Sequence, residues 1–557
     1  RLVNLINVPD INLRSNLYTT EDFLDSLQVS KNYMADQNLY IRERIFDMWI
    51  GDWNKTNENW EWQSHTVNDS VIYTPIVIDR NHAFTKVDGV LFKQMLKMLS
   101  LDFICNYDSL ILKDTKKINK LAFALDMAVA GRSDESVWIR QAQEIRKQMT
   151  DSLIDSAFTY LPEGVKHDEI ELIKRKLKRR RLELEAVASQ YYRLLQRTPV
   201  VAGTNQSDYF LIERQAPDRT ILRIYDPETG DCRLEQQFSG RETKELWLYG
   251  LAGNDTFEVK GNTRKDFPIY LISGEGENQY QLNHNRKIHV YDKDYKYDYQ
   301  KIKYHKISFT PWGIYDSDKG ISLGTFFTYT MYGFKRAPFT YQHRIGYNYL
   351  KGFMYAGVFP NYDGRRRLYL NASISSPRNF ENFFGFGNNT AGYKEEKKNY
   401  NRVKLRTYML NPSFEMDLRK EEVVTFFGSL DMYKAKRTDD RYIYTVYGED
   451  HPIFRTNYFV GLGATYRITK QPYSWLPLLE TEWTAGWKMN LKKPERNFPY
   501  AQGSLSWNVR FSDRFTWASL MKGTVLFDND YEFYQAATID LRGFRDNRFI
   551  GKQSFYQ

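Results

Sequence analysis

Two short segments of the chain hold acidic residues whose types and spacing could support chemistry. Asp52 is followed closely by Asn54, and Asp79 is followed closely by Asn81. A carboxylate can act as a general base or hold a hard divalent cation, whereas an amide cannot act as a base and is a poorer ligand. No Ser-His-Asp set, Walker loop, zinc spacing or paired-carboxylate motif stands out elsewhere, and the eight histidines are scattered.

The two segments together resemble a known pair of motifs. Phe46–Trp60 and Ile78–Phe84 are similar to a Gly-Asp-Trp-Asp-Arg-His…Trp and Arg-Asp-x-Asp-x-Ala-Phe arrangement. This arrangement is typical of atypical-kinase-like modules, and of Bacteroidota proteins that join a calcineurin-like phosphoesterase to a BamA-like barrel. The resemblance implies a phosphotransfer site in which the first motif supplies a catalytic carboxylate and the second holds Mg²⁺.

The chain departs from that pattern at the decisive positions. Asn54 stands at the catalytic Asp, Lys55 and Thr56 replace Arg-His, and Asn81 replaces a metal-binding Asp, so that Asp79 remains as the anionic ligand. We therefore expect a degenerate or purely structural module in a non-catalytic segment. Its two aspartates then brace a helical core.

Two glycine-rich phrases, Tyr249–Val259 and Ser273–Leu282, form a second group. They resemble the Gly-Gly-x-Gly-x-Asp-x-hydrophobic repeat of RTX proteins, whose turns bind Ca²⁺ in a parallel β-roll. Two imperfect copies are not a nonapeptide array, and Asn278 replaces the second Asp. We expect glycine turns in a small sheet or β-solenoid that plugs or braces a barrel mouth. Ca²⁺ at Asp255 is the alternative, and no other cofactor is expected.

The composition combines strong polarity with many aromatic residues. The 557 residues, enough for two or more domains, are 27% charged and 16% aromatic, and the mean hydropathy is -0.62. A transmembrane β-barrel reconciles these values, because half of each strand faces a polar lumen while aromatic girdles mark both interfaces. The most apolar run, Leu121–Ala130, carries Asp126 and is shorter than the ~18 residues of a spanning helix. No signal peptide opens the chain, so we expect a processed or partial product. Two cysteines are too few for a disulfide framework.

From about Tyr304 onward the hydrophobic period is two. Alternation is strict in five segments of roughly strand length: 321–331, 368–375, 454–467, 482–491 and 504–511. Strands this long, with Trp and Tyr near their ends, favour a membrane barrel over a soluble antiparallel sandwich. We count about eleven strands before Tyr531.

The segment that follows these strands contains Leu541, Arg542, Gly543 and Phe544. A hydrophobic-Arg-Gly-aromatic loop at this place resembles the superfamily of BamA and TamA, the bacterial surface antigen proteins. The resemblance implies a 16-strand barrel whose sixth extracellular loop folds into the lumen. There Arg542 locks the loop, since a planar guanidinium binds a carboxylate through two hydrogen bonds. The barrel is incomplete at Gln557, and we expect the chain to continue.

The organisation before the barrel is an α+β periplasmic region. We expect a mainly helical domain over 1–200, a small β-rich domain over 201–300 and the antiparallel transmembrane β-barrel over 301–557. The POTRA repeats usual in the superfamily are not recognised. Helices are expected from Thr19, over 37–50, over 90–100, over 135–160 and, as one long amphipathic element, over 169–196.

The charge pattern bears on partners. The basic run Lys174–Arg181 is interrupted by Leu177 and followed by Glu183, and the net charge is +10. We attribute the run to anionic lipid head groups or an acidic partner and expect no nucleic-acid binding. The expected partners are outer-membrane lipid and lipopolysaccharide, client outer-membrane or surface proteins, and periplasmic or lipoprotein subunits.

The resemblance implies a barrel in the bacterial outer membrane, with its N-terminal region in the periplasm, that assists insertion or translocation of proteins in a specialised or accessory role. The alternative is an outer-membrane-anchored metallophosphoesterase whose catalytic domain lies upstream of residue 1. A passive pore is a third reading.

Overall fold

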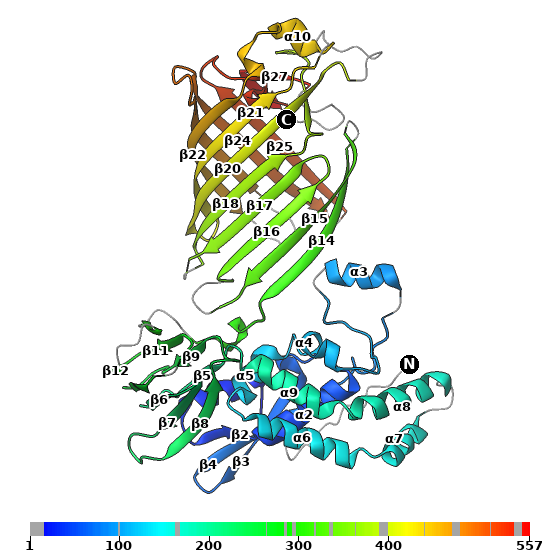
Figure 1. Ribbon diagram of the computed structural model, residues 1–557, viewed down its shortest axis with the longest axis vertical. Coiled ribbons are helices and arrows are strands. Elements are labelled where there is room, and N and C mark those ends of the chain that lie inside the picture. Colours follow the sequence, from blue (N-terminus) through cyan, green and yellow to red (C-terminus); the bar gives the residue numbers. More distant parts are fainter. Residues whose placement is uncertain are drawn as a thin grey trace. The chain divides into compact units, whose positions relative to one another are not determined.

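The computed structural model describes residues 16–87, 89–98, 101–161, 167–262, 264–282, 287–291, 297–316, 319–333, 338–361, 364–388, 399–438, 440–470, 479–512, 514–539 and 548–556. The chain divides into two compact units, Arg1–Tyr304 and His305–Gln557 (Figure 1).

The first unit opens with a four-stranded sheet and the helices that pack against it. The strand order is β1-β3-β4-β2, in which β3 and β4 form an antiparallel hairpin and β2 runs parallel to β4. The strands are β1 (Leu17–Tyr18), β2 (Tyr33–Ala35), β3 (Trp60–Val67) and β4 (Ser70–Val77). The helices are α1 (Thr20–Val29), α2 (Gln37–Ile50), α3 (Val90–Met98), α4 (Thr115–Ile118), α5 (Phe123–Ala130), α6 (Glu135–Gln148), α7 (Asp151–Ala157), α8 (His167–Arg181) and α9 (Leu184–Leu195).

An aromatic core explains this sheet, which the sequence analysis does not predict. Trp60 and Trp62 alternate inward along β3 and are almost fully buried. The Trp62 ring stacks on Phe23 at 3.7 Å between ring centroids, and both tryptophans lie within 6 Å of Tyr40. The alternation of β3 is therefore a local signal for the strand.

The helix predictions hold at their starts and fail at two breaks. The Thr19 side chain caps α1 by accepting the Asp22 N–H at 3.2 Å, as its sequence signature predicts, and α2 has the predicted bounds. The helix expected over 135–160 breaks because Thr150 caps a new helix, α7. The helix expected over 169–196 is likewise two helices, α8 and α9, and at the break Glu183 Oε2 accepts the backbone N–H of Ile111 at 3.0 Å.

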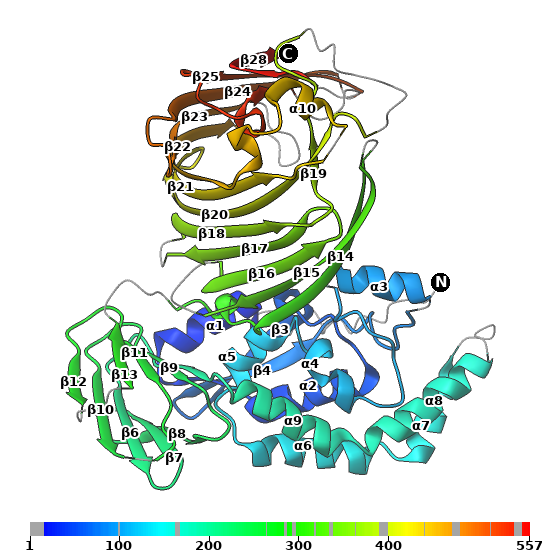
Figure 2. The ribbon, with the colours of Figure 1, turned by 45° about the horizontal axis from the view of Figure 1, so that its top comes forward.

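The second part of the first unit is a β-roll of two parallel layers (Figure 2). One layer has the order β13-β11-β9-β5, all parallel; the other places β12, β10 and β6 in parallel and extends through the antiparallel strands β7 and β8. The strands are β5 (Val200–Ala202), β6 (Tyr209–Gln215), β7 (Arg219–Tyr225), β8 (Cys232–Ser239), β9 (Leu246–Tyr249), β10 (Thr256–Gly261), β11 (Ile269–Ile272), β12 (Gln279–Leu282) and β13 (Ile288–Tyr291). Phe210, Phe257 and Leu271, all fully buried, belong to the core between the layers.

The second unit is one large antiparallel sheet of 13 strands, strongly curved in Figures 1 and 2. Successive strands are neighbours, except that the short β19 pairs only with β20. The strands are β14 (Lys306–Asp316), β15 (Gly320–Met331), β16 (Tyr341–Asn348), β17 (Gly352–Pro360), β18 (Arg366–Ser375), β19 (Phe380–Asn382), β20 (Arg402–Arg419), β21 (Glu422–Ala435), β22 (Asn457–Lys470), β23 (Leu479–Asn490), β24 (Asn497–Ser512), β25 (Phe515–Leu526) and β28 (Gln553–Tyr556). In the order of strands, β14 and β28 stand at the two ends. The predicted antiparallel sheet is confirmed. One detail differs, since Phe454 lies in a 3-10 turn before β22 rather than in the strand.

The connections at the two ends of this sheet differ in length. At the proximal end, where β14 begins, strands are joined through short segments such as 420–421 and 513–514. At the distal end three connections are long, 376–401, 436–456 and 527–552, while 317–319, 349–351 and 491–496 are short. The long connections contain β19, α10 (Tyr442–Tyr447), β26 (Ala537–Thr538) and β27 (Ile550–Gly551).

A buried ion pair joins the helices of the first unit. The Arg44 guanidinium on α2 donates to both carboxylate oxygens of Asp126 on α5, at 2.8 and 3.1 Å, and both side chains are at most 1% exposed. Asp126 also accepts the hydroxyls of Tyr40, at 2.7 Å, and Tyr191, at 2.5 Å. Burial and the Asp126 carboxylate raise the pKa of both phenols well above the usual value, which keeps them protonated donors.

Asp126→Ala should destabilise the first unit by about 3–5 kcal/mol, because it leaves the Arg44 guanidinium buried without its main counter-charge. Hydrogen exchange of α2, α5 and α9 peptides in the full chain measures this loss. Lys113→Ala is the control, since Lys113 and Asp108 form a half-exposed pair at 2.7 Å, and should change stability by no more than ~1 kcal/mol. Equal effects from the two variants would contradict the role assigned to Asp126.

Candidate functional site

Lys55 joins the two acidic segments that the sequence singles out. Its buried ammonium donates to Asp52 Oδ2 at 2.5 Å and to the backbone carbonyl of Asp79, and it lies 3.6 Å from Asp47. Asp79 Oδ1 accepts the backbone N–H of Asn81 at 2.7 Å. The structure thus brings the side chain of the first aspartate and the main chain of the second together around one lysine.

The carboxylates of this cluster are satisfied from within. Burial raises the pKa of Asp52 although Lys55 opposes the shift, and the partly buried Asn54 approaches Asp52 Oδ1 with its backbone N–H at 3.4 Å. Arg80 neutralises Asp47 through a 2.9 Å hydrogen bond and also pairs with Glu43. Such an arrangement fits the bracing role and does not offer Mg²⁺ an open set of oxygens.

Sequence reasoning missed the residues that anchor this cluster, Arg44 and Asp126. A usable signal was present, because Asp126 is a charged residue inside the most apolar run of the first unit. A charge in such a run is retained only when a partner is buried with it. Nothing local to Asp126 identifies Arg44 as that partner.

The glycine turns of the β-roll form three stacked rungs rather than two. Asp208, Asp255 and Asn278 precede the paired strands β6, β10 and β12 at equivalent positions. Asp255 Oδ1 accepts the backbone N–H of Asp208 at 2.9 Å, and Asn278 Oδ1 accepts the backbone N–H of Asp255 at 2.9 Å. Each side chain therefore fastens its own rung to the preceding one.

Glycine makes room for these side chains. A Cβ on Gly250 would lie 2.1 Å from Asp255 Oδ2, and a Cβ on Gly203 would lie 2.6 Å from Asp208 Oδ2. Gly203 marks the first rung, which the sequence analysis missed because the β7–β8 hairpin separates it from the second.

The surroundings of Asp255 do not fit a calcium ion. The side chain is fully buried, and one of its oxygens is used in the ladder. Burial raises the pKa of Asp255 to about 8, which makes it a neutral acid near pH 7. In the part of the chain that the structure describes, no group of three His, Cys, Asp or Glu side chains could hold a metal ion. The expected glycine turns agree better with this geometry than the Ca²⁺ alternative does.

Described parts of the long distal connections of the second unit form a packed cluster with the strand ends, which we term the lid. It covers the distal ends of β20, β21 and β22 and includes residues of α10 and β27. Its buried members are Phe383, Val403, Leu405, Tyr433, Ala435, Ile443, Ile453, Phe454, Phe459, Phe533 and Ile550.

Both flanks of the predicted loop motif are held in the lid. On one side Glu532, 2% exposed, pairs with Arg496 at 2.9 Å. On the other side Ile550 accepts the Gly387 N–H at 2.8 Å, and Arg548 lies 4.7 Å from the Phe384 ring centroid. Strands β26 and β27 pair the two flanks with each other. The motif itself, Leu541, Arg542, Gly543 and Phe544, lies outside the described residues, so the lumenal lock stays a prediction.

The two faces of the large sheet differ in chemistry. One face carries ion pairs between strands: Arg367 on β18 bonds to Glu415 at 2.7 Å and to Asp417 at 2.8 Å on β20, and Lys488 on β23 bonds to Asp431 on β21 at 2.8 Å. The other face exposes large apolar side chains along the whole sheet. These include Ile307, Ile321, Leu323, Phe327, Ile345, Phe353, Leu368, Phe414, Phe426, Leu430, Leu462 and Trp483.

Comparison with known proteins found similarity among solved structures. No family model matches the chain, and no curated protein matches it. Among solved structures, a similar chain is BamA from Haemophilus ducreyi lacking POTRA domains 1-3, with 12% identity, a TM-score of 0.31, and coverage of 47% of this chain and 48% of that one. This chain thus spans about half the length of the BamA chain it matches. In the described residues, no helix is long and apolar enough to cross a membrane.

The buried Asp255 predicts a pH dependence of the β-roll. An unfolded chain releases this proton near pH 4 and the folded one near pH 8, so the free energy of unfolding should fall with rising pH across that window by at most ~1.4 kcal/mol per unit from this group. Asp255→Asn keeps the acceptor for the Asp208 N–H, removes the slope and stabilises the roll at pH 7 by on the order of a few kcal/mol.

Hydrogen exchange of peptides from β9 to β12 in the full chain, corrected for intrinsic rates between pH 5 and 8, tests this. Asp231→Asn, at an exposed position of the β7–β8 turn, serves as the control and should keep the wild-type slope. An unchanged slope in the Asp255→Asn variant would show that Asp255 does not titrate as described.

Proposed function

We propose that the second unit is an outer-membrane β-barrel and that the protein assists insertion or translocation of other proteins, in a specialised or accessory role. The observation that carries the membrane placement is the apolar outward face, since soluble proteins rarely expose contiguous apolar patches larger than a few hundred Å². Leu323 and Ile321 are 66% and 70% exposed, for example.

Strand pairing supports the same placement. In lipid every backbone N–H and C=O must be satisfied inside the protein, which long antiparallel strands achieve between neighbours. The strands β20 and β24, of 18 and 16 residues, exceed the ~10 residues needed to cross the hydrocarbon when tilted. The inner face, with its ion pairs, then lines a wet lumen.

The loop lengths support an orientation. Barrels of the outer membrane have short periplasmic turns and longer extracellular loops. The proximal end, with its short connections, is accordingly the periplasmic end. The first unit, whose chain leads into β14 at that end, then belongs to the periplasm.

The assembly role rests on the loop motif and its setting. The sequence Leu541–Phe544 is similar to the lumenal loop of BamA-like proteins, and its flanks are fixed in the lid by β26 and β27. The lid packs buried aromatic side chains over the distal ends of β20, β21 and β22, which favours a gated protein over an open pore.

A lysine on the outward face should be far more costly than one on the inner face. Leu430→Lys, near the middle of β21, should lower the free energy of unfolding in lipid vesicles by about 2–4 kcal/mol, because the charge enters hydrocarbon. Thr425→Lys on the same strand is the matched control. Thr425 lies on the inner face, paired with Glu415 on the neighbouring strand β20, so a lysine there should be tolerated. Equal tolerance of both variants would argue against a bilayer around this face.

Depletion of the protein, followed by quantitative outer-membrane proteomics, tests the assembly role. We expect a defined subset of barrels or surface lipoproteins to fall at least severalfold, and the wild-type chain to restore them. The Arg542→Ala variant should fail to restore them. The control variant Arg545→Ala, which lies just after the Leu541–Phe544 motif, should restore them. Unchanged levels of every outer-membrane protein would count against this function.

A further inference from the structure

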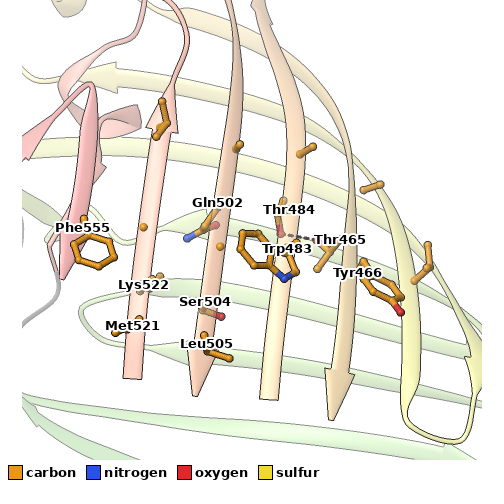
Figure 3. A pocket seen from close by; sticks show the side chains of 17 residues that line it. Thr465, Tyr466, Trp483, Thr484, Gln502, Ser504, Leu505, Met521, Lys522 and Phe555 are labelled. Carbon is orange, nitrogen blue, oxygen red and sulfur yellow. Dashed lines mark hydrogen bonds between the residues drawn. The ribbon is translucent and has the colours of Figure 1, made fainter. Parts of the chain in front are cut away.

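A groove of about 740 Å³ crosses the outward face of β22, β23, β24 and β25 and reaches β28 (Figure 3). This volume lies within the ~300–1,000 Å³ typical of ligand pockets. Figure 3 shows Phe555 at one edge, Tyr466 at the other, and Trp483 between them. The groove is thus bounded by aromatic rings that belong to strands on opposite sides of it.

The floor of the groove includes small residues in register, beside the larger Val424, Leu505, Met521 and Val525. Ala464, Ala485 and Ala501 are paired across three neighbouring strands, and Gly503 is paired with Gly523 across the next two. Comparable outward positions on β20 and β21 carry large side chains, among them Phe414, Phe426 and Leu430. The apolar surface is therefore locally lowered over β22–β25.

The Trp483 indole lies over the backbone of β24 within the groove. A Cβ on Gly503 would lie 2.7 Å from Trp483 Cζ3, so the indole rests directly against the glycine backbone. The side chain nevertheless remains 60% exposed, and Phe555 remains 68% exposed. Each ring thus presents a broad apolar surface to whatever occupies the space between them.

The groove offers its occupant no charge. Its polar lining residues, such as Thr465, Thr484 and Lys522, alternate with the floor residues and so belong to the inward positions of their strands. Its depth fits hydrocarbon as well, since Ala464 and Ala485 lie near the middle of β22 (Asn457–Lys470) and β23 (Leu479–Asn490). A head group would lie near the strand ends, and only a chain would lie here.

We propose that this groove retains an acyl chain of a phospholipid from the surrounding leaflet. The proposal rests on the membrane placement of the barrel. An alkyl chain has no hydrogen-bonding group to satisfy, follows an irregular channel by rotating about its bonds, and gains by covering exposed aromatic surface. A helix of a partner, which also packs on small residues, is the competing occupant.

The test places the full chain in phospholipid nanodiscs that contain a trace of phospholipid with a mid-chain diazirine. After irradiation, labelled peptides are mapped. We expect labelling of β23–β25 to exceed that of β16–β18 severalfold. Ala485→Leu with Ala501→Leu fills the floor and should reduce this excess to the β16–β18 level. Ala372→Leu, on the outward face of β18, is the matched control and should leave the excess unchanged.

The labelling pattern distinguishes failure of the groove assignment from failure of the membrane placement. Uniform labelling of all outward strands would overturn the groove assignment while preserving the barrel. Weaker labelling of β23–β25 than of β16–β18, together with a larger particle mass, would assign the groove to a protein partner. No labelling of any strand would overturn the membrane placement itself.

Discussion

Satisfaction of backbone hydrogen bonds between neighbouring strands is the constraint on which the second unit depends. Because pairing consumes the N–H and C=O groups of each strand, the side chains alone determine what each face contacts. Phe426 and Ala464 are opposite each other on the outward face, while Thr425 and Thr465 are opposite each other on the inward face. A shift by one residue would exchange the two faces along a whole strand, so the alternation also fixes the register.

The same alternation explains a composition that otherwise appears contradictory. A mean hydropathy of -0.62 and 27% charge describe a chain in which the inward half of each strand, the loops and the first unit are polar. In the first unit, several charged side chains are buried rather than turned to a polar face. Arg44, Asp126 and Lys55 are buried as pairs, each with hydrogen bonds to further groups, which is the condition under which buried ions are tolerated.

Local patterns were predictable from the sequence, and distant partners were not. The strands of the large sheet follow from a period of two, and the starts of α1 and α2 follow from Thr19 and from amphipathic spacing. The break after α8 was not predicted, and it accompanies a contact from Glu183 to Ile111, far away in the sequence. The break after α6 has a local signal, the cap at Thr150, which the sequence analysis overlooked. The first rung of the β-roll was not predicted either, because the inserted β7–β8 hairpin lengthens the spacing between its glycine turn and the next one. At the candidate site, the motif gave Asp52 and Asp79, and only the fold gave the lysine between them.

Glycine has opposite consequences on the two faces of the sheet. Inward, Gly463 and Gly486 are covered by the cross-strand rings of Phe427 and Tyr500, which approach the position of the missing Cβ to within 2.3 and 2.5 Å. These pairs fill the space inside a tightly curved wall, as an aromatic ring over glycine does in other curved sheets. Outward, Gly503 carries the Trp483 ring in the same way, whereas the neighbouring Ala485 and Ala501 line the groove. Curvature brings inward side chains together and spreads outward ones apart. A row of small residues that would pack closely inside therefore leaves an open channel outside, and a molecule from the surroundings has to fill it.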